Sequence, residues 1–173
     1  ETDTWGAEQT GAFLDRINHL EKDYLGKHNK GSMLDRVNIV YDDIYDNTTE
    51  PGLLTQLNAV EWGLMHEVSP KALDKRVTEM EMAVAGKTSA GTYKKRIQDL
   101  GTAACGGYSV PLEQATVPKN TVIKIALTQE VNAKNLKVGD TIEYQVADDV
   151  FVNDVLVFTK GSRGEGTVTK VRQ

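Results

Sequence analysis

The sequence repeats itself every 20 residues through its first hundred residues. Four columns of apolar side chains keep one phase over five copies. The columns are Phe13, Met33, Leu53, Leu73 and Tyr93; Ile17, Val37, Leu57, Val77 and Ile97; Leu20, Val40, Val60, Met80 and Leu100; and Tyr24, Ile44, Leu64, Val84 and Ala104. A fixed period of this length is typical of stacked supersecondary units. It constrains the fold more than any other feature of the chain.

Each copy of the repeat predicts one amphipathic helix. The columns are spaced as i, i+4, i+7 and i+11, which places them on one helical stripe. Residues that end helices follow each stripe, as at Gly26, Pro51-Gly52 and Gly86. A helix this short cannot cover its own stripe, so neighbouring copies must pack against each other. We therefore expect a helical repeat domain of five repeats over 11–106, a small bundle or short solenoid, after a flexible lead-in over 1–10.

The hydrophobic period changes from 3.6 to 2 after Pro118. Apolar and polar residues alternate in 121–129 and again in 141–150, as in half-buried strands. Asn153-Asp154 predicts a turn between two further strands. Residues 107–117 contain a proline and no helical period, which indicates a linker. We expect a small antiparallel β-barrel or sandwich over 118–173, and hence an α+β protein with segregated helices and strands.

The charge distribution excludes several partners. The net charge is -5, and the excess of acids lies in the first 106 residues. No part of the chain has the clustered basic surface that phosphate groups need, so we expect no nucleic-acid partner. No apolar run approaches the ~18 residues of a membrane helix, so we expect no membrane span in this chain.

One polar column of the repeat is a candidate interaction face. Arginines share a single phase in four copies, and Gln56 takes that place in the third copy; the arginines are Arg16, Arg36, Arg76 and Arg96. In one interpretation the guanidinium groups bind carboxylates or anionic glycans. In the other, each arginine pairs with an acid of an adjacent helix, such as Glu21, Glu61 or Glu81. Trp62, beside the Val60 column, is either an anchor for a partner or a packed aromatic between the domains.

The residues that usually carry catalysis are not arranged for it. His19, His28 and His66 lie at different phases of the repeat, so they do not predict a metal site. The adjacent acids Asp42-Asp43 are not a catalytic pair by their spacing alone. No nucleophile elbow or phosphate-binding glycine loop is present. We therefore predict no catalytic residue, metal or cofactor, and a protein that is not an enzyme.

Two C-terminal strings resemble a recurrent pattern of small β-domains in exported bacterial proteins. They are VPKNTVIKIALTQEV and KVGDTIEYQVADDVFVNDVLVFTKGSRGEGTVTKV. The pattern is distantly similar to the barrel segment of type IV secretion channel proteins. The chain departs from it at Asn120, where glycine is usual, and at Thr159, where proline is usual. The membrane-inserting hairpin of a channel protein has no counterpart here, so the resemblance implies no secretion role.

The N-terminal strings LDRINHLEKDYLGK (14–27) and LDKRVTEMEMAVAGK (73–87) resemble the repeats of uncharacterised exported bacterial proteins. This resemblance implies a location in the periplasm or cell envelope. Together, the observations predict a non-enzymatic structural spacer or adaptor that binds another protein or a cell-wall polymer. The alternative is a ligand- or glycan-binding β-domain carried on a helical stalk that forms homo-oligomers.

Overall fold

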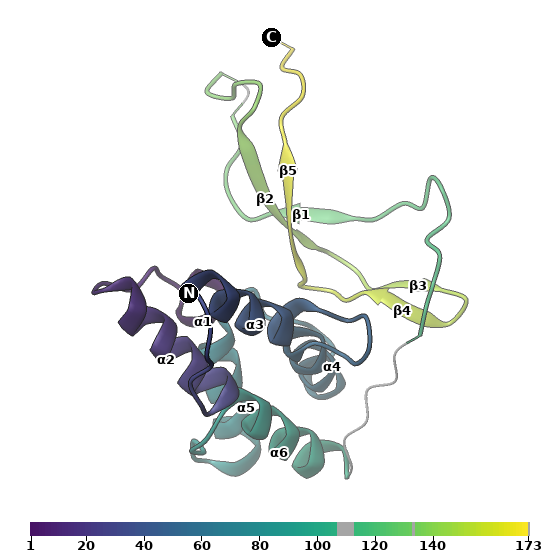
Figure 1. Cartoon of the computed structure of the whole chain (residues 1–173). Helices are drawn as coiled ribbons and strands as arrows, with labels where there is room; N and C mark the ends of the chain where they lie inside the picture. Colours follow the sequence, from purple (N-terminus) through teal and green to yellow (C-terminus); the bar gives the residue numbers. More distant parts are fainter. Residues whose placement is uncertain (107–112, 133, 173) are drawn as a thin grey trace. The chain divides into compact units, whose positions relative to one another are not determined.

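The computed structural model describes residues 1–106, 113–132 and 134–172 (Figure 1). This part of the chain contains six helices followed by five strands, which confirms an α+β architecture with the helices first. The chain forms two compact units. The first consists of Glu1–Leu64 and Lys71–Leu112, and the second of Met65–Pro70 and Glu113–Gln173.

The five predicted repeat helices are all present, and each is 13 residues long. They are α2 (Phe13–Leu25), α3 (Met33–Tyr45), α4 (Leu53–Met65), α5 (Leu73–Ala85) and α6 (Tyr93–Cys105). The helix of the last copy, α6, is as long as the other four. Gly106 closes it in the left-handed conformation, as Gly26 closes α2 and Gly86 closes α5.

Helix α3 ends differently from these three helices. Its C-cap is Asp46 in an extended conformation, and the loop that follows is held by its own side chains. The Asp46 carboxylate accepts hydrogen bonds from the Thr48 backbone N–H and hydroxyl, both at 2.9 Å. Asn47 Oδ1 accepts from the Gly52 N–H at 2.9 Å. This connection is therefore an Asx-type turn rather than a glycine-capped one.

The repeat columns form the core of the first unit. Ile17, Leu57, Val77 and Ile97 of the second column are almost fully buried. One cluster of buried side chains runs from α2 to α6. The rings of Tyr24 on α2 and Tyr93 on α6 lie 5.0 Å apart, so the first and last repeat helices are in contact. The helices therefore enclose a common core, as the periodicity requires.

The prediction of a flexible lead-in over residues 1–10 is corrected by the structure. Helix α1 (Thr2–Trp5) packs on the repeat helices through Thr4, whose hydroxyl lies 2.9 Å from the Tyr24 hydroxyl. The Trp5 ring stacks on His19 with 4.5 Å between ring centroids. Glu1 lies 20 residues before Glu21, so this segment belongs to the repeat rather than preceding it.

The strands of the second unit form two sheets. Strand β2 (Thr141–Val146) lies between β1 (Ile125–Leu127) and β5 (Arg163–Thr167), and all pairs are antiparallel. A separate hairpin pairs β3 (Val150–Val152) with β4 (Val155–Phe158). Its turn is at Asn153-Asp154, both with positive φ, as the sequence predicts. Within the described residues the predicted barrel does not close, because β1 and β5 each pair with β2 and leave the sheet open.

Of the strand predicted over 121–129, only Ile125–Leu127 forms β1, and its alternation holds for pairing but not for burial. Ile125 pairs with Val146 and Leu127 with Tyr144, so these residues share one face of the sheet. Ile125 and Leu127 nevertheless remain half-exposed. Asn120, the position where the related pattern has glycine, has φ 71°. It therefore adopts the left-handed conformation that glycine would supply.

The predicted domain boundary also needs correction. Residues Met65–Pro70, which are the last residue of α4 and most of the loop before α5, group with the strands and not with the helices. Val68 is 3% exposed, and its N–H donates to the Lys160 carbonyl at 2.7 Å. The corresponding residues in the other loops that join two repeat helices are His28, Thr48 and Thr88, so among these loops Val68 alone is apolar at this place. The predicted linker over 107–117 falls largely on 107–112, which lie outside the described residues.

We predict that Gly161→Ala destabilises the second unit more than Gly139→Ala. Both glycines have positive φ, which costs about 1–2 kcal/mol for a residue with a Cβ. A Cβ at Gly161 would also overlap the Val68 carbonyl oxygen, whereas a Cβ at Gly139 meets no atom within 4 Å. The overlap adds roughly 1–3 kcal/mol. Hydrogen exchange of the β2 and β5 amides measures the difference, and equal protection in the two variants would contradict it.

Candidate functional site

The arginine column predicted as an interaction face is taken up in internal ion pairs. Each arginine pairs with the glutamate 15 positions earlier in the chain. The pairs are Glu1–Arg16, Glu21–Arg36, Glu61–Arg76 and Glu81–Arg96. The structure thus shows the arrangement of the second interpretation, in which the arginines join neighbouring helices. The 15-residue offset recurs because both partners repeat every 20 residues.

The geometry of the Glu21–Arg36 pair is bidentate. Arg36 Nε donates to Glu21 Oε1 at 2.9 Å, and Nη2 donates to Oε2 at 2.6 Å. The same Nη2 donates to Asn18 Oδ1 at 2.5 Å. Arg96 repeats this pattern with Glu81 and Thr78. Arg76 differs in one detail, because its Nε and Nη2 both donate to the same oxygen of Glu61, Oε2, while Nη2 also donates to Asn58. A planar guanidinium fits this fork of acceptors, and lysine would not.

The glutamates also hold the loops. Glu21 Oε1 accepts from the Asn29 backbone N–H at 3.2 Å, and Glu1 Oε2 accepts from the Gln9 N–H at 3.4 Å. In both copies the amide lies eight residues after the glutamate. The hydrogen bond from Arg36 is the largest cause that lowers the pKa of Glu21, to about 2. One carboxylate therefore fixes its own helix, the following loop and the next helix.

The paired arginines are poorly available to an external ligand. Arg36 and Arg76 are buried, and Arg16 and Arg96 are partly buried. A carboxylate from outside would have to displace the resident glutamate. Trp62 lies next to Glu61 on α4 and is partly buried. Both roles considered for it, an anchor for a partner and a packed aromatic between the domains, remain predictions.

The third copy of the repeat lacks the ion pair. Tyr41 stands where the other copies have glutamate, and Gln56 stands where they have arginine. Gln56 Nε2 donates instead to the Pro51 carbonyl at 2.6 Å. The joint between α3 and α4 is therefore held by the Asx-type turn and by Gln56, without a buried charge pair.

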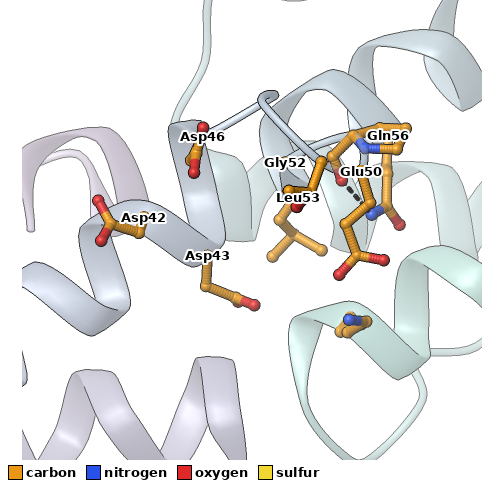
Figure 2. Close-up of a pocket in the computed structure, with 10 residues that line it drawn as sticks. Asp42, Asp43, Asp46, Glu50, Gly52, Leu53 and Gln56 are labelled. Carbon is orange, nitrogen blue, oxygen red and sulfur yellow. Dashed lines mark hydrogen bonds between the residues drawn. The ribbon is translucent and has the colours of Figure 1, made fainter. Parts of the chain in front are cut away.

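A pocket of about 100 Å³ lies at this gap, lined by α3, the loop after it, α4 and Lys94 of α6 (Figure 2). Acidic side chains line it, among them Asp43 and Glu50. Burial raises the pKa of Asp43; Lys94 acts in the opposite direction, and Glu50 adds to the rise. We name this group of residues the gap pocket. The gap pocket was not predicted from the sequence, although the glutamine at Gln56 in a column of arginines was a signal for it.

The described residues offer no other chemical centre of the usual kinds. No group of three or more His, Cys, Asp or Glu within them could hold a metal ion. The histidines lie apart, with His19 against Trp5 and His28 near Glu21. None of the described helices is long and apolar enough to cross a membrane.

Comparisons of the chain with protein-family models, with curated proteins and with solved structures find no match.

We predict that Arg76→Met lowers the free energy of unfolding by about 3–5 kcal/mol, because it leaves the Glu61 carboxylate buried without its charge partner. Lys95→Met is the matched control, since Lys95 and Asp99 form an exposed ion pair. Such pairs contribute about 0–1 kcal/mol. Urea denaturation followed by circular dichroism measures the free energy of unfolding of both variants. Similar decreases in the two variants would show that the buried pair at Arg76 contributes no more than an exposed one.

We also predict that Glu21 contributes stability that disappears in acid. The folded-state pKa of about 2 lies below the ordinary value of 4.5, so the contribution is complete above pH 4.5 and is lost as the pH falls toward 2. Glu21→Gln should therefore have a lower free energy of unfolding than the parent chain at pH 7, and the difference between the two chains should be smaller at pH 2.5. Glu79→Gln, at an exposed carboxylate, is the control. A difference in the free energy of unfolding that stays constant between pH 7 and 2.5 would contradict the acid-dependent contribution of Glu21.

Proposed function

We propose that this chain is a non-catalytic module of the bacterial cell envelope that acts as a structural spacer and protein-interaction adaptor. The location rests on the resemblance of the repeat and of the C-terminal strings to exported bacterial proteins. Fractionation of cells that express the full gene tests it, and recovery in the cytosol alone would contradict it. We infer that the helical unit is a closed bundle rather than an open solenoid, because Tyr24 contacts Tyr93 across it.

The observation that carries the adaptor proposal is the uneven burial of the first apolar column. Leu53, Leu73 and Tyr93 are buried, whereas Phe13 is 55% exposed and Met33 is 49% exposed. The residues that follow these two, Leu14 and Leu34, are exposed as well. All four lie in the first turns of α2 and α3. We call these four side chains the first-turn patch.

The repeat itself indicates what fits the first-turn patch. In α4, α5 and α6 the equivalent position is covered by apolar side chains of the bundle. An exposed position that is core in its sister copies is suited to a partner that supplies the same cover. We therefore propose an amphipathic helix of another protein as the partner, in preference to a cell-wall polymer, which would need polar contacts.

We predict that a photo-crosslinking residue at Leu34 yields one discrete adduct in cells that produce the full chain. Lys75 is the matched control, because it is exposed in the first turn of α5. Met33→Ser should reduce the Leu34 adduct and change the free energy of unfolding by less than about 1 kcal/mol, since Met33 is half-exposed. Equal adducts at Leu34 and Lys75, or an adduct that Met33→Ser leaves unchanged, would contradict the adaptor proposal.

One observation favours the second candidate, a ligand- or glycan-binding β-domain on an oligomerising stalk. The strands leave Phe151, Ile125 and Leu127 about half-exposed, and aromatic surfaces of this kind suit sugar or apolar ligands. Sedimentation of the full chain separates the two candidates. A monomer favours the adaptor, and an oligomer that Met33→Ser dissociates favours the stalk.

A further inference from the structure

The gap pocket contains two hydrogen-bond acceptors without a donor. Among the described residues, these buried side-chain atoms are Gln56 Oε1 and Asp43 Oδ2. Gln56 is 8% exposed, and its orientation is fixed because Nε2 donates to the Pro51 carbonyl. A flipped amide would bring two oxygens together there. Buried polar atoms are nearly always satisfied, so two orphans lining one pocket call for an explanation.

The charge of the gap pocket is strongly negative. Its acids are Asp42, Asp43, Asp46 and Glu50, and they face one lysine, Lys94. Figure 2 shows the Asp43 side chain extending from α3 toward Glu50, while Asp42 extends the other way. Glu50 contributes to the raised pKa of Asp43, which agrees with this proximity. The pocket therefore combines acceptor atoms with an excess of negative charge.

The other copies of the repeat show what is missing here. In each of them an arginine of the later helix supplies a positive charge and several N–H donors between two helices. The third copy has Gln56 in that column, so the joint between α3 and α4 lacks its internal cation. A ligand that brings N–H donors and positive charge would supply both.

The same observations disfavour a metal ion. No set of three His, Cys, Asp or Glu in the described parts of the chain is arranged to hold one. A pocket of about 100 Å³ instead has room for the head group of an organic cation. Guanidinium and ammonium groups donate several hydrogen bonds in different directions, which suits acceptors from α3, the loop and α4.

We propose that the gap pocket binds a guanidinium or primary ammonium group through Gln56 Oε1, Asp43 and Glu50. The group belongs either to a free small amine or to an arginine or lysine side chain of another protein. This binding site is independent of the first-turn patch, so either assignment can fail without the other. A buried carboxylate without a hydrogen-bond donor costs stability, and a bound cation would compensate that cost.

The test is an NMR titration of the ¹⁵N-labelled full chain with methylguanidinium and with methylammonium. The reporters are the Gln56 side-chain amide and the backbone amides of Asp43 and Gly52. We expect saturable shifts at these reporters. Tetramethylammonium, which has no N–H donor, and sodium chloride at equal ionic strength should not produce them. Equal shifts with tetramethylammonium or sodium chloride, saturation by calcium chloride in place of the amines, or no shift with either amine would overturn the proposal.

Two variants make the assignment specific. Asp43→Asn should weaken binding at least tenfold, whereas Asp15→Asn, at an exposed acid in the first turn of α2, should leave it unchanged. Gln56→Arg restores the arginine of the other copies and should abolish binding while raising the melting temperature. Undiminished binding in a folded Gln56→Arg chain would contradict the site even if Asp43→Asn failed to fold.

A last comparison identifies the source of the group. Agmatine represents a free amine, and a short capped peptide with a central arginine represents a protein side chain. Saturation by agmatine alone would assign the pocket to a small molecule, and saturation by the peptide would assign it to a protein partner. If neither probe saturates the reporters, the proposal fails.

Discussion

A carboxylate withdrawn from water needs charged and polar partners, and the helical unit is organised around meeting that need. Glu21 receives a guanidinium from the next helix and an amide from the loop between them. The guanidinium partner recurs at the other glutamates of its column. Removing one partner would leave a buried charge, so the helices, loops and ion pairs stabilise each other. The apolar stripe supplies the driving force for packing, and the ion pairs fix which helices meet and how.

Much of the helical unit could be predicted from the sequence, because hydrophobic period depends on residue type alone. The positions of five helices follow from four apolar columns. The pairing of Arg36 with Glu21 was one of two open interpretations, since spacing does not distinguish a pair within the chain from a pair with a ligand. Glu1 was missed because residues 1–10 show no apolar stripe.

The second unit was harder to predict, for physical reasons. Alternation indicates strands but not how they close, and pairing depends on residues far apart in sequence. A strand as short as Ile125–Leu127 cannot bury its apolar face without a second layer. Val68 carried a usable signal, since it is apolar where other copies have polar residues. What it would pack against could not be read from its neighbours. The gap pocket could be predicted only by comparing the copies of the repeat. Gln56 is informative because the other copies have arginine at this place, as at Arg36 and Arg76.

The position of each joint inside the repeat has an evolutionary consequence. The glutamate and its arginine are 15 residues apart within a period of 20. A tandem duplication of the unit therefore also duplicates the residues that form the ion pair with the neighbouring copy. A gene could lengthen or shorten such a bundle by whole copies without inventing a new contact. The connection from Tyr41 to Gln56 is the exception, because these residues replace the glutamate and the arginine. A copy inserted there would lack the ion pair. Changes in copy number are therefore least costly away from the middle of the array.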